Sequence, residues 1–392
     1  MGEAVISTVG WRRQERTQGS GMARVRGIVR GAVAGLLLSV GALAPAHAAS
    51  TTERSASILI FPKVVFDGSR DTSIQISNTS NSMVHAHCFY VNAAPLCIGA
   101  GDCLAGTCNG TCEPQWVEVD FSIWLTKQQP THWGVGNGRF TDPGDQQCDF
   151  HTDNYECDGA GFDPGRIPPA SSIPFVGELR CIEVDPSGAP LNGNHLKGEA
   201  TIVSSDGDTA KYNAVGLLGL PFTNNGDEVL CLGGGVTDEC PSGAEYEGCG
   251  ERLILNHFAE NADSPLFGPT SQVSTEVTLV PCRADYERQD PTRITVQFLA
   301  SNEFEQRFSA STKVECWRSF FLEDVGNIFE IRAAQTRFVE TQMRPSDLAN
   351  SGFVGVAEEY HHLDGQQTRA AFNIPEQGTR PKTDLIFLPE GP

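Results

Sequence analysis

One polar segment of this chain concentrates acidic side chains: Asp142, Asp145, Asp149, Asp153 and Asp158. Calcium takes roughly six to eight oxygen ligands from carboxylates and carbonyls, and a loop of this composition could supply them. The spacing is not that of an EF-hand. We prefer the interpretation that this is a loop of solvated charge closed by a disulfide. Calcium is nevertheless the best cofactor hypothesis that the residues offer.

A second group of residues that could bind a metal is the sequence His85-Ala-His87-Cys88. In a strand, alternate residues share a face, so the two histidines lie together and Cys88 lies on the opposite face. A metal site would therefore need ligands from elsewhere, such as His361 and His362. We prefer the simpler interpretation of two solvent-side histidines beside a core or disulfide-bonded cysteine.

Thirteen cysteines lie between Cys88 and Cys316, and we interpret them as disulfide partners. A cytosolic chain rarely holds so many without metal, and zinc sites need paired C-x2-C units, whereas the closest spacing here is Cys108-x3-Cys112. The odd count leaves at least one thiol free, buried or bonded to another chain. The candidates are Cys88, Cys97, Cys103, Cys108, Cys112, Cys148, Cys157, Cys181, Cys231, Cys240, Cys249, Cys282 and Cys316.

Most of these crosslinks are expected to be local, within three cysteine-rich loops at residues 97–112, 148–157 and 231–249. Loops this polar bury little apolar surface, so crosslinks would have to hold them in place. Four cysteines are expected on strands instead: Cys88, Cys181, Cys282 and Cys316.

The chain contains no motif of a nucleophilic or zinc-dependent hydrolase. Neither G-x-S-x-G nor H-E-x-x-H occurs. A glycosidase needs only two carboxyl groups at the right separation, with no fixed spacing in sequence. Trp116 and Trp124 could stack on a sugar, although packing under a neighbouring element is the preferred interpretation. We assign no catalytic residues.

The elements that must position these residues are predominantly strands. Apolar and polar residues alternate around Ile74 and Ile76, and again over residues 117–125, 273–279 and 294–298. Such alternation is typical of strands with one face in the core and one in water. Short turns rich in Gly, Pro, Asn and Asp favour antiparallel pairing, because parallel strands need long crossovers.

Helical spacing is scarce, and only residues 251–258 and 345–350 are expected to form short helices. The sequence therefore predicts an all-β protein of tandem antiparallel β-sandwich domains with disulfide-bearing loop insertions. A Pro- and Gly-containing stretch at residues 259–270 suggests the boundary. We expect a signal peptide over residues 1–48, a first sandwich over 49–262 and a second over 263–392.

Residues 58–90 resemble the opening strands of immunoglobulin-like and fibronectin-III-like domains of exported bacterial proteins. The resemblance is carried by the run from Ile74 to Asn78 and by the strand that ends at Cys88-Phe-Tyr90. It implies an immunoglobulin-like sandwich and says nothing about activity, because one fold hosts many functions.

The N-terminal segment predicts export. Basic residues follow Met22, which is an alternative start, and an apolar run over residues 32–43 precedes Ala46-His47-Ala48. Small residues at these positions form a signal-peptidase site. The apolar run is shorter than the roughly 20 residues of a membrane span, and no other stretch of the chain is apolar enough to be one. We expect a secreted, periplasmic or cell-surface bacterial protein.

The charge excludes one class of partner. The chain carries −21 and its first 48 residues hold six arginines and two glutamates, a net +4, which leaves −25 for the remainder. Nucleic-acid phosphates would repel such a protein. The partners that remain are another protein, a cell surface or further copies of the chain.

Three functions are therefore open. The leading hypothesis is a non-catalytic protein of surface structure, adhesion or assembly, and the alternatives are a carbohydrate-active extracellular hydrolase and a calcium-binding surface protein. A cleft with a solvent-open carboxylate pair would favour the hydrolase. A long unpaired edge strand or a flat apolar patch would favour assembly.

Export makes a direct prediction about the mature N-terminus. Signal peptidase should cut after Ala48, because Ala46 and Ala48 are the small residues that it recognises. Mass spectrometry of the exported product should show a chain that begins at Ala49. A product that retains Met22 would contradict this interpretation.

Overall fold

The computed structural model describes residues 50–96, 113–114, 116–139, 156–157, 161–162, 166–170, 174–221, 224–346 and 351–389. The predicted signal peptide and the acidic residues Asp142, Asp145, Asp149, Asp153 and Asp158 lie outside them. The residues from His47 to Pro392 belong to one compact unit. The described chain is all-β, with several antiparallel sheets and three disulfides, which confirms the predicted fold class at this level.

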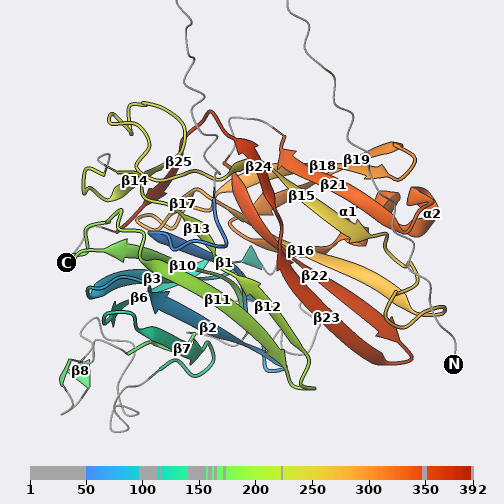
Figure 1. Cartoon of the computed structure of the whole chain (residues 1–392), viewed down its shortest axis with the longest axis horizontal. Coiled ribbons are helices and arrows are strands. Elements are labelled where there is room, and N and C mark those ends of the chain that lie inside the picture. The colour runs from blue at the N-terminus through green and yellow to red at the C-terminus, as the bar shows by residue number, and fades with distance from the viewer. Residues whose placement is uncertain are drawn as a thin grey trace, which may run out of the picture. The chain divides into compact units, whose positions relative to one another are not determined.

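The first half of the chain forms a nine-stranded sheet that folds over on itself (Figure 1). Its strands are β1 (Ile58–Phe66), β2 (Arg70–Asn78), β3 (Val84–Asn92), β6 (Val117–Leu125), β7 (Pro130–Gly134), β10 (Phe175–Val184), β11 (Leu196–Ser204), β12 (Thr209–Asn213) and β13 (Val215–Leu217). β1 and β2 pair only where Phe66 meets Asp71. One layer is therefore β7-β2-β11-β12 and the other is β6-β3-β10-β1-β13.

Alternating apolar residues fill the space between these two layers. Ile74 and Ile76 of β2 are fully buried, as the sequence pattern predicts, and pack in one cluster with Phe121 of β6. Each such side chain stabilises the fold by about 1.5–3 kcal/mol through the apolar surface that it removes from water. Trp133 and Tyr90 add a buried hydrogen bond of 2.6 Å between the indole nitrogen and the phenol oxygen.

Both faces of β1 are buried, as they are in its neighbour β10. The second face of β1 packs under a small sheet formed by β14 (Val229–Leu232), β25 (Asp384–Phe387) and β17 (Ala284–Asp285). A strand buried on both sides reads as a continuous apolar run, and this explains why residues 58–66 show no alternation.

The second half of the chain forms a second pair of sheets around its own core. One sheet runs in the order β19 (Arg307–Glu315), β18 (Arg293–Asn302), β21 (Phe338–Pro345), β15 (Gly250–Phe258) and β24 (Glu376–Thr379). The other runs in the order β20 (Arg318–Phe321), β16 (Gln272–Pro281), β22 (Phe353–Leu363) and β23 (Gln366–Asn373). The alternating residues predicted at 273–279 and 294–298 face this core.

The remaining described elements are short. Two two-stranded ladders pair β4 (Pro95–Leu96) with β5 (Glu113–Pro114) and β8 (Glu156–Cys157) with β9 (Gly161–Phe162). Three single helical turns follow β20: α1 (Leu322–Val325), η3 (Asn327–Phe329) and α2 (Ile331–Ala334). No helix in the described part of the chain is long and apolar enough to cross a membrane.

The expectation of a helix over residues 251–258 is wrong, because this segment is strand β15. Leu253, Leu255 and His257 are buried and alternate with more exposed neighbours, so the segment has a period of two. The expected domain division after residue 262 would separate β15 from β21 and β24, the strands with which it pairs. The expected helix over 345–350 falls largely on residues 347–350, outside the described chain.

Three disulfides are present among the described residues: Cys88–Cys181, Cys231–Cys240 and Cys249–Cys282. They indicate an oxidising environment. Cys231–Cys240 closes a local loop, whereas Cys88–Cys181 joins neighbouring strands at directly opposed positions. The other candidates outside the described residues are Cys97, Cys103, Cys108, Cys112 and Cys148, together with the side chain of Cys157.

Cys316 is the free thiol of the described chain. It does not lie on a strand as expected, because it occupies the turn between β19 and β20 with a φ of 49°. Cys282 directly follows β16, and Cys88 and Cys181 lie on β3 and β10 as predicted.

A buried ionic network joins the two sandwiches. Lys63 of β1 is 2% exposed, and its amine contacts the carboxylates of Glu276 (2.6 Å) and Glu358, on β16 and β22. Arg369 on β23 contacts Glu358 and reaches Asp208 beside β12 at 3.3 Å. Because charges buried at such a contact need partners, this network couples the first half of the fold to the second.

The Lys63 network predicts a large loss of stability when its central cation is removed. Lys63→Met leaves Glu276 and Glu358 buried without their shared countercharge, and we expect the free energy of unfolding to fall by about 3–5 kcal/mol. Lys211→Met is the matched control, since Lys211 forms an exposed pair with Glu199 and should cost about 0–1 kcal/mol. Denaturant unfolding measures both; equal losses would contradict a special role for Lys63.

Candidate functional site

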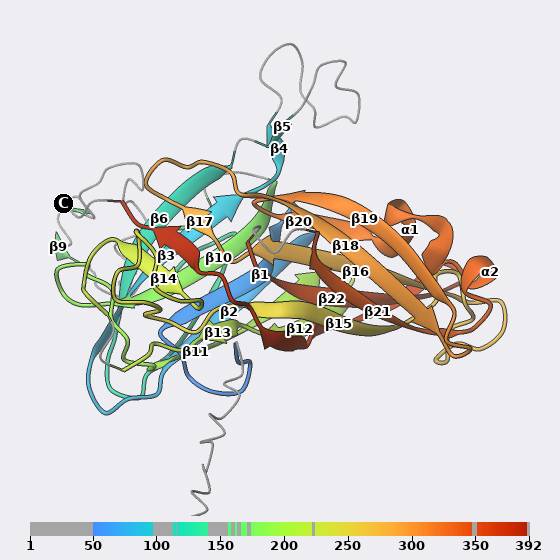
Figure 2. The same ribbon diagram turned by 90° about the horizontal axis from the view of Figure 1, so that it is seen from above.

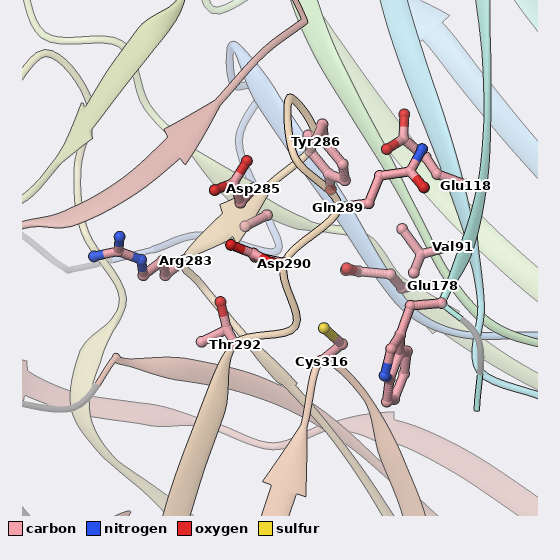
Figure 3. Close-up of a pocket in the computed structure, with 12 residues that line it drawn as sticks. Val91, Glu118, Glu178, Arg283, Asp285, Tyr286, Gln289, Asp290, Thr292 and Cys316 are labelled. Carbon is pink, nitrogen blue, oxygen red and sulfur yellow. The ribbon is translucent and has the colours of Figure 1, made fainter. Parts of the chain in front are cut away.

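A small pocket with several polar side chains in its wall lies against the outer face of β3, β6 and β10 (Figure 3). Val91, Glu118 and Glu178 project from these strands, and the facing wall comes from residues 283–292 and Cys316. The pocket therefore forms only when the strands of the first sandwich meet the turn that follows β16.

Glu118 and Glu178 are brought together by strand register. Glu118 of β6 and Glu178 of β10 both pair with Val91 of the intervening β3, so the three residues form one row across the sheet. Opposed residues in neighbouring strands lie about 4.5–5.5 Å apart, which places the two α-carbons about 10 Å from each other. In composition this row resembles the carboxyl pair of a glycosidase.

The two carboxyl groups of the row differ in their surroundings. Burial raises the pKa of Glu118 to about 8, and the nearby charge of Asp120 adds to this effect, so Glu118 is protonated at neutral pH. Glu178 is 3% exposed, and burial raises its pKa although the guanidinium of Arg180, 3.0 Å away, opposes the shift. Arg180 also donates to the carbonyl oxygen of Cys282 at 2.8 Å and is locked in place.

Tyr286 and Cys316 complete the polar lining of the pocket. The ring of Tyr286 stacks on Phe89 at 4.2 Å, and its hydroxyl is buried without a hydrogen-bond partner in the described structure. Burial raises the pKa of Tyr286 well above its ordinary value and that of the Cys316 thiol to about 12. Since the thiolate is the nucleophile, Cys316 is not activated for catalysis.

The size of the pocket decides what it can do. Its cavity measures about 30 Å³, enough for one or two ordered water molecules that could bond to Tyr286. Pockets that take small organic ligands are roughly ten times larger. The carboxyl row therefore has no space for a sugar, and Glu178 is already committed to Arg180.

A larger hollow of about 440 Å³ opens at the far end of the second sandwich. Beside it, Ser264, His361 and Glu359 form a hydrogen-bonded chain, with 2.8 Å from the serine oxygen to His361 Nδ1 and 2.8 Å from His361 Nε2 to Glu359. The order resembles a Ser-His-acid triad. The serine is 1% exposed and accepts a hydrogen bond from the Leu266 amide, so it holds the loop between β15 and β16 in place and is shielded from a substrate.

The two histidines that the sequence raised as metal ligands share a face of β3, and each has another partner. His85 stacks on Trp124 at 4.2 Å, and His87 bonds to Asp120 at 2.7 Å. Cys88 lies on the opposite face, as predicted, and is disulfide-bonded. Among the described residues, no group of three or more His, Cys, Asp or Glu side chains is arranged to hold a metal ion.

The buried ion pairs of the structure have a signal in the sequence that no motif describes. Glu178 and Arg180 interrupt the apolar strand β10, and Lys63 interrupts β1. A charge inside a doubly buried strand needs a partner, so each position indicates a buried ion pair. Trp116 is also buried and lines the pocket wall, in line with the packing interpretation.

The raised pKa of Glu118 predicts how stability depends on pH. The folded state holds a proton on Glu118 up to about pH 8, whereas the unfolded chain releases it near 4.5, so stability falls as pH rises through this window. Glu118→Gln should flatten the decline, and Ser122→Ala on the same face of β6 should not. Denaturant unfolding from pH 5 to 9 tests this; parallel curves for Glu118→Gln and wild type would contradict it.

Comparison with known proteins adds no family to this description. The chain matches no protein-family model, and it has no significant match among curated proteins.

Proposed function

We propose that this is an exported, non-catalytic protein of surface structure, adhesion or assembly that acts through contacts at an edge strand. The observation that carries the proposal is β19, which pairs with β18 on one side and with no described strand on the other. Figure 2 shows β19 at the rim of its sheet. A nine-residue strand with a free edge is suited to pairing with another strand.

The hydrogen bonds at both ends of β19 identify its outward-facing backbone groups. The Cys316 amide donates to the Thr292 carbonyl at 2.8 Å, and the Asn302 amide donates to the Gln306 carbonyl at 3.2 Å. Even-numbered residues of β19 thus bond to even-numbered residues of β18. Because bonding alternates along an antiparallel pair, the odd-numbered residues from 307 to 313 direct their amides and carbonyls away from β18.

The side chains along this edge agree with a role in contact. The odd-numbered side chains are exposed, namely Arg307, Ser309, Ser311 and Lys313. Their even-numbered neighbours are more buried and pack toward the core. One outward-facing carbonyl of this edge is already bonded, since Lys313 accepts a hydrogen bond of 2.8 Å from the Arg318 guanidinium. No backbone amide or carbonyl elsewhere in the described chain bonds to the edge from 307 to 313.

The alternatives have less support. A hydrolase needs a substrate-sized cleft with an accessible acid pair, and the pocket at Glu118 and Glu178 is water-sized. The acidic residues proposed for calcium lie outside the described chain. Disulfides and the predicted signal peptide support export, and two sandwich-like bodies support our proposal of tandem immunoglobulin-like domains.

The proposal predicts that blocking the edge abolishes binding without unfolding the protein. Ser311→Pro removes one outward amide in the middle of β19 and leaves the ladder to β18 intact, since proline is tolerated at edges. Ser311→Ala, which keeps the amide, is the control. Pull-down from the native envelope or medium should lose its partners at least about tenfold with proline only.

Two outcomes would contradict this proposal. One is undiminished capture by Ser311→Pro with an unchanged circular dichroism spectrum. The other is turnover of a polysaccharide or ester by the purified protein that disappears in Glu118→Gln.

A further inference from the structure

We infer that the partner of β19 is β19 of a second copy of this chain, paired antiparallel about a twofold axis at Ser311. This inference rests on the proposed function, because it names the occupant of the same edge. The two five-stranded sheets would then continue into one another across the dimer. Such a contact is isologous: each copy contributes the same residues, and the assembly closes at two.

The register follows from the groups that face outward. Only odd-numbered residues can bond across the edge, so the axis must set odd residues opposite odd residues. The central choices lie at Ser309, at Ser311 or between them, and an axis at Thr312 opposes only residues 309–315. An axis between them sets Arg307 opposite Lys313 in both halves, which repels. An axis at Ser309 opposes only residues 307–311. The axis at Ser311 opposes the whole strand from 307 to 315. The Glu315 carbonyl already accepts the Trp317 amide at 2.5 Å and the Lys313 carbonyl accepts the Arg318 guanidinium, so each has one lone pair left for the partner strand.

The side chains complement one another about Ser311. Arg307 of each copy meets Glu315 of the other, Ser309 meets Lys313, and Phe308 meets Val314 on the core side. Glu315 is 43% exposed although it pairs with Arg293, so its carboxylate can accept a second cation. Opposite charges at directly opposed strand positions favour pairing, and like charges oppose it.

The same charges explain how indiscriminate strand pairing is avoided. Arg307 and Lys313 project from an edge of a chain whose net charge is −21. Lysine and arginine on an edge disfavour pairing with most strands, because they must be left without countercharge. Only a partner with an acidic residue at the matching position relieves this, and β19 itself supplies one at Glu315.

The test is a complementation between two charge reversals, measured by sedimentation velocity over a concentration series. Wild type should form a dimer. Arg307→Glu alone opposes two glutamates at each end, and Glu315→Arg alone opposes two arginines, so each should dimerise at least about tenfold more weakly. An equimolar mixture of the two variants restores opposite charges at both ends and should form a heterodimer.

The outcomes separate this inference from the proposed function. A monomeric wild type at high concentration overturns the second-copy inference, while loss of native partners in Ser311→Pro would still support the contact function. A dimer that Ser311→Pro and both charge reversals leave unchanged places the interface elsewhere and overturns the inference. A mixture no tighter than the single variants rejects the Ser311 register.

Discussion

The buried amine of Lys63 is the constraint on which the arrangement of this protein depends. A lysine that is 2% exposed needs carboxylates beside it, and those carboxylates come from β16 and β22, in the other half of the chain. Lys63 in turn stabilises the charged form of Glu276. Burial alone would raise the pKa of this carboxyl group, and the amine of Lys63 lowers it to about 2. Neither sandwich can turn away from the other without leaving a charge buried and unpaired.

Further contacts carry this constraint to the edge strand. The Trp317 indole donates to the Pro62 carbonyl at 2.7 Å, directly beside Lys63. Cys316 precedes it and faces the Glu178 pocket. The turn that ends β19 is thus tied to the first sandwich, while the strand itself keeps a free edge. The fold therefore holds β19 at a defined position from its C-terminal end.

Part of this organisation could be predicted from the sequence. Alternation identified the strands around Ile74 and the buried face of β16, because burial on one side of a sheet is a local signal. At residues 251–258 the period-two burial of Leu253 and Leu255 identifies a strand, so the expected helix there is wrong. The doubly buried β1 has no alternation, so only its length and apolar run indicate a strand.

The candidate sites were harder to foresee, because their members come from distant parts of the chain. The carboxylates that pair with Lys63 lie in the other half of the chain. The row of Glu118, Val91 and Glu178 depends on the order of strands in the sheet. Residues close in sequence, such as His85 and His87, are the ones that sequence patterns suggest as metal ligands. In the structure His85 stacks on Trp124 and His87 bonds to Asp120. The free edge of β19 is a property of topology, which no local pattern records.

The most direct test of the contact account is amide hydrogen exchange along β19 at low and high protein concentration. The amides of Ala310 and Thr312 bond to β18 and should be protected at both. The amides of Ser309 and Ser311 should exchange rapidly when the protein is dilute and become protected when a partner or second copy occupies the edge. Rapid exchange of these two amides under every condition that permits binding would contradict the account.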